Sequence, residues 1–173
     1  MSLRVVEVVP YHPRWPVLFE DEAALLRRTL GDVVVHIHHI GSTSVPGLVA
    51  KPIIDILLEV TSLAALDALN EAMRAIGYEP RGELGIPRRR YFPKGGMDRT
   101  HQVHAFVAGD EHVTRHLAFR DYLRAHPETA REYGELKITV ARECDNDIER
   151  YCDGKDAYVK RVEAQALRAY AIR

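Results

Sequence analysis

The sequence predicts an α+β fold with a helical C-terminal third. Short runs rich in β-branched residues occupy the first two thirds of the chain, and longer stretches with apolar residues at helical spacing follow them. Strands followed by helices favour α+β over a doubly wound parallel sheet. The length of 173 residues suits one domain spanning residues 1–173.

The elements follow from local patterns. Strands are expected at residues 4–9, 33–40, 53–60 and 101–108, and a loop with a short strand between residues 82 and 100. A first amphipathic helix is expected from Trp15 to Leu30, and a second from Thr61 or Ser62 to Ile76. Helices are also expected at residues 112–126, 128–144 and 156–171, the first of them stopped by Pro127.

The overall composition argues against several classes of partner. Basic and acidic residues nearly cancel, with a net charge of -1, so no nucleic-acid or membrane partner is indicated. Cys144 and Cys152 are the two cysteines and form neither a CxxC pair nor a disulfide framework. The amino terminus lacks the apolar core of a signal peptide, and no run of residues is long enough to span a membrane. We therefore expect a cytoplasmic protein, whose oligomeric state the sequence does not specify.

A glycine-serine step after the strand at residues 33–40 predicts an anion-binding turn. Gly41 allows the backbone to approach a ligand, and Ser42, Thr43 and Ser44 offer hydroxyl donors to a phosphate. Lys51 either adds positive charge to this pocket or is solvated. Because glycine-serine turns are common, an ordinary turn is the alternative interpretation.

Asp55 lies within the next apolar strand. Alternation places Asp55 and Leu57 on one face of this strand and Ile54 and Ile56 on the other. A carboxylate on a central strand is costly to bury unless it is paired or holds a cation. Asp55 is therefore either in an ion pair or a ligand of Mg²⁺, which prefers carboxylate and phosphate oxygens.

Several blocks of the sequence resemble one known family. The run "HIGSTSVPGLVAKPIIDI" at residues 39–56 is similar to the signature of the GrpB family, also called UPF0157, which belongs to the nucleotidyltransferase superfamily. "GIPRRRYFPKG", "HQVHAF" and "HLAFRDYLRAHPETAREYGELK" also look like that family. The resemblance implies a mixed β-sheet flanked by helices.

The resemblance also implies site residues. Gly41 and Ser42 match the turn that binds the triphosphate of a donor nucleotide, and Asp55 matches the first acid that holds Mg²⁺. Leu57 stands where the second acid is expected. On the later strand, Gln102 and His104 stand where a third carboxylate is sought. By the same resemblance, His39 beside the turn is a site candidate.

Cations outside the turn complete the candidate set. Arg88 and Arg90 belong to a dense basic loop, which either contacts an anionic ligand or is a solvated surface. In the C-terminal helices, Tyr133 and Lys137 share one helical face, and Lys155 lies near Tyr158. Either these pairs are exposed on the surface of their helices, or one helix contributes a cation to the mouth of the pocket.

Two functions remain open from the sequence. The first is a protein that binds a nucleotide or phosphorylated metabolite and transfers a nucleotidyl group, with Asp55 holding a divalent cation, preferably Mg²⁺, and His104 assisting. The second is a non-catalytic ligand-binding or regulatory module. Family members fused to dephospho-CoA kinase would connect such a module with coenzyme A metabolism.

Overall fold

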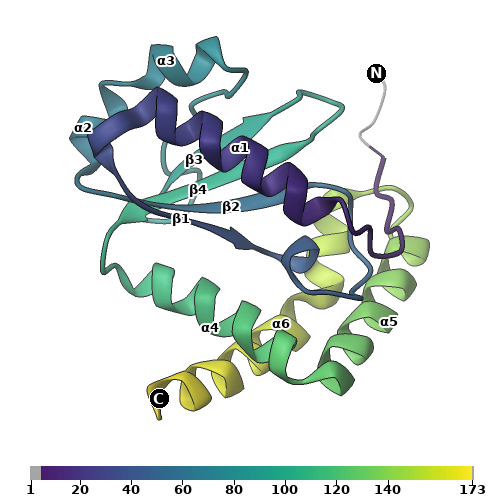
Figure 1. Cartoon of the computed structure of the whole chain (residues 1–173). Coiled ribbons are helices and arrows are strands. Elements are labelled where there is room, and N and C mark those ends of the chain that lie inside the picture. Colours follow the sequence, from purple (N-terminus) through teal and green to yellow (C-terminus); the bar gives the residue numbers. More distant parts are fainter. Residues whose placement is uncertain (1–4, 173) are drawn as a thin grey trace.

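The computed structural model describes residues 5–172 and has a four-stranded mixed sheet at its centre (Figure 1). The strands are β1 (Val34–Ile40), β2 (Ile54–Val60), β3 (Arg90–Lys94) and β4 (His101–Val107), in the order β1-β2-β4-β3. β1 and β3 are antiparallel to their neighbours, whereas β2 and β4 are parallel. The predicted α+β class is confirmed.

Helices cover both faces of this sheet (Figure 1). On one side lie α1 (Trp15–Leu30), α2 (Leu63–Asp67) and α3 (Asn70–Ala75). On the other side lie α4 (Glu111–Ala125), α5 (Pro127–Glu143) and α6 (Ile148–Ala171). Short 3₁₀ turns, η1 (Gly31–Val33) and η2 (Ser42–Ser44), precede and follow β1. Among the described residues, no helix combines the length and apolarity needed to cross a membrane.

The central strand β2 has two apolar faces, as its alternation predicts. Ile56 and Leu58 are fully buried in the main core with α1, while Leu57 is fully buried in a second cluster beneath α4. Glu59, near the end of this strand, is a buried acid. Glu59 is 7% exposed because it pairs with the imidazole of His38 on β1, with 2.6 Å between Oε2 and Nε2.

The expected and observed elements differ at four places. Residues 5–9 form no strand, only a bridge between Val9 and Ala50, and Arg4 lies outside the described residues. The expected helix from Ser62 to Ile76 is broken into α2 and α3, because the chain tightens into a turn at residues 68–69. Pro127 follows the end of α4 as predicted, because the residue before a proline avoids the helical conformation, but α5 begins at Pro127 itself and not at residue 128, since its missing N–H costs nothing there.

The fourth difference is the start of α6, eight residues before the expected position 156. Asp147 caps this helix by accepting hydrogen bonds from the backbone N–H groups of Glu149 and Arg150. The earlier start places residues 148–155 on a helix, close to the start of β2.

The segment between β1 and β2 is held in place from both sides. Gly41 has a φ of 73°, which favours glycine, and opens the η2 turn. His39 is buried, stacks on Phe19 of α1 with 4.8 Å between ring centroids, and lies 2.9 Å through Nε2 from the Thr43 hydroxyl. From the other side, Arg120 and Arg124 of α4 donate to the carbonyls of His39 and Ser44.

Burial of His39 makes the anchoring of this turn sensitive to acid. Desolvation lowers the pKa of His39 to about 4, despite the opposing attraction of Asp55, so the folded protein keeps the ring neutral. Between pH 6.5 and pH 4 the unfolded chain binds a proton that the folded chain does not. Stability therefore falls as the pH drops through this window.

We predict that His39→Gln removes this part of the pH dependence. The variant should be less stable than the parent at pH 8, because the stacking on Phe19 is lost, and the difference should shrink by up to about 3 kcal/mol as the pH falls to 4. Urea unfolding of both proteins at pH 8, 6, 5 and 4 measures the difference. Parallel stability curves over this range would contradict the assignment.

Candidate functional site

A cavity of ≈ 220 Å³ opens beside the η2 turn, between the start of β2 and the helices α5 and α6. Its walls combine hydroxyl, lysine and aromatic side chains with one acid. The lining residues are Ser42, Thr43, Ala50, Lys51, Ile53, Asp55, Gln102, Lys137, Tyr151, Cys152 and Lys155. The glycine-serine turn and Asp55 therefore meet at one cavity, as expected from the sequence.

Lys137 of α5 is the most deeply buried cation of this cavity. Its side chain is 2% exposed, its Nζ donates to the carbonyl of Val49 at 2.8 Å, and the ammonium lies 5.0 Å from the centre of the Tyr133 ring. Burial, reinforced by the positive charges of Lys155 and Lys51, lowers the pKa of Lys137 to about 6, against a smaller opposing effect of Asp55. An anion bound beside this ammonium would offset the free-energy cost of burying its charge.

Two further lysines flank one aromatic ring. The Nζ atoms of Lys51 and Lys155 each lie 4.9 Å from the centre of the Tyr151 ring. Tyr151 is fully buried, and burial raises the pKa of its phenol above the usual value, so the ring carries no charge at neutral pH. Together with Lys137, these lysines give the cavity more positive than negative groups, because Asp55 is the one acid among the described lining residues.

Asp55 is held by donors rather than by other acids. His104 Nε2 donates to Asp55 Oδ1 at 3.2 Å. The side-chain amide of Gln102 takes the orientation in which its nitrogen and its oxygen both form hydrogen bonds. The nitrogen donates to Asp55 Oδ1 at 3.1 Å, and the oxygen accepts from Tyr91 and Arg99. The Oδ2 atom faces the turn so closely that a side-chain carbon at Gly41 would lie 2.6 Å from it.

These contacts do not provide the metal site that the superfamily pattern implies. Among residues 5–172, no group of three histidine, cysteine or acidic side chains is placed to hold a metal ion. Leu57, in the position of the second acid, is fully buried with Ile40 and Phe106. Asp55 alone does not fit a protein-held Mg²⁺, since the ion would need phosphate oxygens and water for most of its coordination shell. Mg²⁺ at Asp55 stays a prediction.

His104 is a positioning group in this arrangement. Its Nε2 is engaged with Asp55, and its Nδ1 is buried without a hydrogen-bond partner. His101 and His104 lie on opposite faces of β4, since His101 points toward Glu22 of α1, with 3.9 Å between Nε2 and Oε2. Burial lowers the pKa of His101.

The three hydroxyls of the turn have different roles. The Ser44 hydroxyl donates to the carbonyl of Gly41 and closes the turn, so it does not face the cavity. Thr43 lines the cavity but is 2% exposed and shares its hydroxyl with His39. Ser42 lines the cavity and is half-buried. Of the hydroxyls predicted to bind an anion, that of Ser42 is the most accessible, and His39 acts through Thr43.

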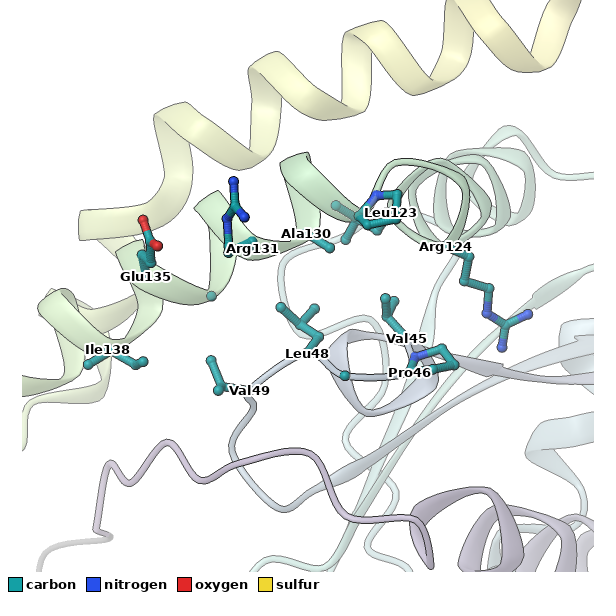
Figure 2. A pocket seen from close by; sticks show the side chains of 13 residues that line it. Val45, Pro46, Leu48, Val49, Leu123, Arg124, Ala130, Arg131, Glu135 and Ile138 are labelled. Carbon is teal, nitrogen blue, oxygen red and sulfur yellow. The ribbon is translucent and has the colours of Figure 1, made fainter.

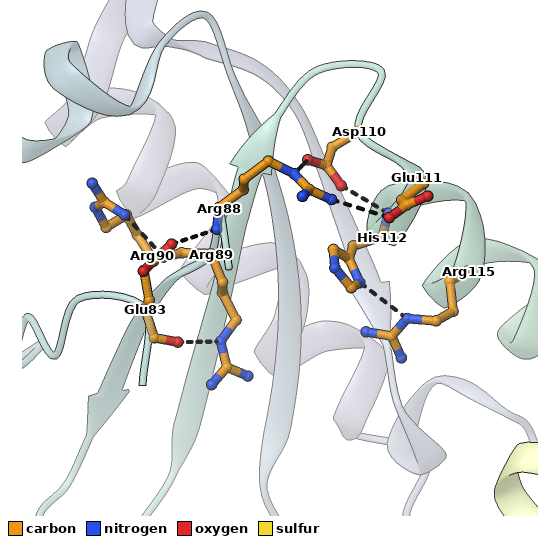
Figure 3. A network of polar contacts seen from close by, with 8 residues as sticks. All are labelled: Glu83, Arg88, Arg89, Arg90, Asp110, Glu111, His112 and Arg115. Atoms are coloured by element: carbon orange, nitrogen blue, oxygen red, sulfur yellow. Dashed lines mark hydrogen bonds and ion pairs between the residues drawn. The ribbon is translucent and has the colours of Figure 1, made fainter. Parts of the chain in front are cut away.

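Arg88 and Arg90 are not brought to this cavity (Figure 3). Arg88 has a φ of 67°, so strand alternation does not apply to it, and it pairs with Asp110 and Glu111 at the start of α4. Arg90 makes a bidentate pair with Asp67 of α2, at 2.8 and 3.1 Å. These pairs fix the loop and β3 to the neighbouring helices, which accounts for their charge without a ligand.

Between these two arginines, Arg89 is buried and structural. Its guanidinium donates to the backbone carbonyls of Glu83 and Leu84, and the first of these bonds is drawn in Figure 3. It also lies 5.0 Å from the centre of the Tyr91 ring. The densest basic run of the sequence therefore folds one loop rather than forming an anion site.

The C-terminal helices supply site residues that the sequence analysis left undecided or missed. Lys137 and Lys155 line the cavity. Their position therefore agrees with the interpretation that the C-terminal helices contribute cations to the pocket, and not with simple exposure on a helix surface. Tyr151 was missed because the start of α6 was placed too late. The capping aspartate at position 147, followed by an apolar residue, is the sequence signal that would have found it.

Comparisons with known proteins place the chain among a set of related sequences. The sequence model described as "GrpB protein" matches residues 5–165. UPF0157 protein YqkA of Bacillus subtilis is 48% identical over 165 residues, covering 95% of this chain and 48% of YqkA. A dephospho-CoA kinase of Mycolicibacterium paratuberculosis is 29% identical over 181 residues, covering 90% of this chain and 44% of the kinase. The chain thus spans about half the length of these two relatives.

Two solved structures resemble the fold. The conserved protein GrpB from Enterococcus faecalis superposes with a TM-score of 0.91 and 44% identity, covering 95% of this chain and 99% of that protein. The Cid1 poly(U) polymerase bound to MgATP gives a TM-score of 0.50 and 13% identity, covering 75% of this chain and 45% of the polymerase, a likeness of fold alone. Since the family model matches nearly the whole sequence, the chain belongs to the GrpB family and has a nucleotidyltransferase-like fold.

Proposed function

We propose that this chain binds a small phosphorylated ligand in the lysine-lined cavity beside the η2 turn. The observation that carries the proposal is the convergence of Lys51, Lys137 and Lys155 on one small cavity that contains a single acid, Asp55. The turn contributes the hydroxyl of Ser42. Lysine ammonium groups and hydroxyls are groups that proteins use to bind phosphate.

The burial of Lys137 supports a binding role over a structural one. A buried ammonium with one backbone acceptor and one aromatic ring is costly for the fold, and an apolar side chain would pack there at less cost. Costly buried groups of this kind are common at functional sites. A bound phosphate provides the missing countercharge.

Binding without nucleotidyl transfer is the form of the proposal that the residues favour. Metal-assisted transfer needs carboxylates to hold ions that stabilise the charge on the transferring group. Here the second-acid position is the buried Leu57, and the third-acid region provides the donors Gln102 and His104. We therefore place the chain's own contribution in binding and orienting a phosphate, with no step assigned to a metal.

The relatives guide the choice of ligands to be tried. One relative is named dephospho-CoA kinase, and the Cid1 structure contains MgATP. Calorimetric titration with ATP, CTP, dephospho-CoA, coenzyme A and inorganic phosphate, each with Mg²⁺ and with EDTA, tests the proposal. We expect at least one of the phosphorylated compounds to bind with 1:1 stoichiometry in EDTA. Absence of binding by all five would refute it.

We predict that Lys137→Met and Lys155→Met each weaken binding of the phosphorylated ligand about tenfold or more, because each removes a donor that is charged when the phosphate is bound. Lys160→Met on α6 is the matched control: Lys160 is paired with Asp156 and does not line the cavity. It should change the Kd less than twofold. Circular dichroism and thermal unfolding establish that the variants fold. Equal effects of all three substitutions would point to general surface charge instead.

Ligand binding is also predicted to draw a proton from solution. Because the pKa of Lys137 is about 6 in the free protein, this lysine is largely neutral at pH 7.5, and a bound phosphate should restore its charge. Affinity should therefore rise as the pH falls from 8 toward 6. Calorimetry in buffers of different ionisation enthalpy should show an uptake approaching one proton at pH 7.5 that is absent in Lys137→Met. The same uptake in both proteins would exclude Lys137 as its source.

Asp55→Asn separates direct binding from binding through a metal. If lysines alone hold the phosphate, removal of the nearby negative charge should leave the Kd unchanged or lower it, with or without EDTA. If a divalent ion bridges Asp55 and the phosphate, the parent protein should lose affinity in EDTA, and the variant should bind weakly under both conditions. We expect the first result, measured by calorimetry with the ligand identified above.

A further inference from the structure

A second, larger cavity of ≈ 790 Å³ lies between segment 45–49 and α5 (Figure 2). Its floor is apolar, and charged side chains line its edge. The lining residues are Val45, Pro46, Gly47, Leu48, Val49, Leu123, Arg124, Pro127, Ala130, Arg131, Gly134, Glu135 and Ile138. This volume and this mostly apolar wall are typical of sites for small organic molecules.

The wall between the two cavities is shared. The side chain of Val49 lines the apolar cavity, whereas its carbonyl accepts the hydrogen bond from Lys137 in the lysine-lined cavity. Likewise Arg124 lines the apolar cavity and donates through Nε to the carbonyl of Ser44, at the end of the η2 turn. A molecule bound against segment 45–49 would therefore contact the residues whose neighbouring carbonyls hold Lys137 and the η2 turn in place.

The charge at the edge favours an anionic head group. Arg124 and Arg131 line the cavity, against the one acid Glu135 among the described lining residues. Burial of its guanidinium, together with the nearby Arg120, lowers the pKa of Arg124, so an anion beside it would stabilise its charge. With Nε turned to Ser44, the guanidinium of Arg124 lies beyond Pro46, at the end of the cavity that Val45 and Pro46 line (Figure 2).

We propose that this cavity is a second ligand site, for a small amphipathic carboxylate whose apolar body lies against Leu48, Val49 and Ala130 and whose carboxylate pairs with Arg124. The ligand is further proposed to act on the lysine-lined cavity, because its binding would fix the Val49 and Ser44 carbonyls that hold Lys137 and the turn. This site is distinct from the anion site proposed above.

Decanoate and decanol, used below the critical micelle concentration, are the probes for this site. Calorimetric titration of the full chain should show 1:1 binding of decanoate that is at least fivefold tighter than that of decanol. Arg124→Gln should remove this preference for the charged probe. Ile138→Glu should weaken both probes at least tenfold, since Ile138 lines the cavity and is 39% exposed, so the variant is expected to fold. Ile172→Glu, at an 86% exposed position outside the cavity, is the matched control.

Three results would overturn the proposal. Decanoate fails to bind, or it binds no better than decanol, or Ile138→Glu leaves its affinity unchanged. Sedimentation velocity tests whether a second copy of the chain occupies the cavity instead. A dimer that Ile138→Glu converts to a monomer, together with no decanoate binding, would show that it does.

The coupling has its own test. Saturating decanoate should change the Kd of the phosphorylated ligand at least threefold, and Lys137→Met should weaken binding of that ligand about tenfold or more while leaving decanoate binding intact. An unchanged Kd would refute the coupling. Binding of decanoate by a chain that binds no phosphorylated compound would refute only the function proposed above, so the two failures are distinguishable.

Discussion

The burial of one ammonium group is the constraint on which the site depends. Lys137 connects α5 to the segment after the η2 turn through the Val49 carbonyl, and this contact sets the distance between α5 and the start of β2. Because the ammonium is almost removed from water, the surroundings lower its pKa and leave it short of a countercharge. The fold thus maintains a buried amine next to Asp55 and the turn, whose protonation a bound anion would favour, at a free-energy cost that an apolar residue would avoid.

The strand core was accessible to sequence reasoning because its residues obey one local rule. Alternation along residues 53–60 correctly assigned Ile56 to one face of the sheet and Leu57 to the other, and it kept Asp55 on the face that carries the cavity. The first helix was likewise bounded correctly, with Gly31 as its cap. Where the burial of the side chains and the local backbone conformation favour the same element, the sequence pattern is enough to predict that element.

The remainder of the site depends on contacts between distant segments. The lysine at position 137 lies 88 residues from its acceptor at Val49, and no local pattern distinguishes a buried helical lysine from a solvated one. Arg88 and Arg90 illustrate the converse. Their density in sequence indicated an anion site, but the fold supplies Asp110 and Asp67 as partners from elements 22 and 23 residues away. A cluster of charged residues in the sequence predicts that these residues need partners of opposite charge, but it does not show whether the partner is a side chain of the same protein or a ligand.

Leu57 connects the fold with the chemistry. The superfamily pattern that the sequence resembles implies a second acid at this position of β2, and an acid that holds a metal ion needs space beside it for the ion. In this chain α4 packs on that face, and Leu57 is fully buried with Val113 of α4 and Phe106 of β4. A carboxylate at this position would be a buried charge without a partner, which is far more costly than the apolar contact it would replace. The apolar residue at position 57 therefore suits the packing of α4, and the cavity at the start of β2 is lined by Asp55, Gln102 and the lysines. This is why the function proposed above assigns the cavity to holding an anion and not to transferring a nucleotide.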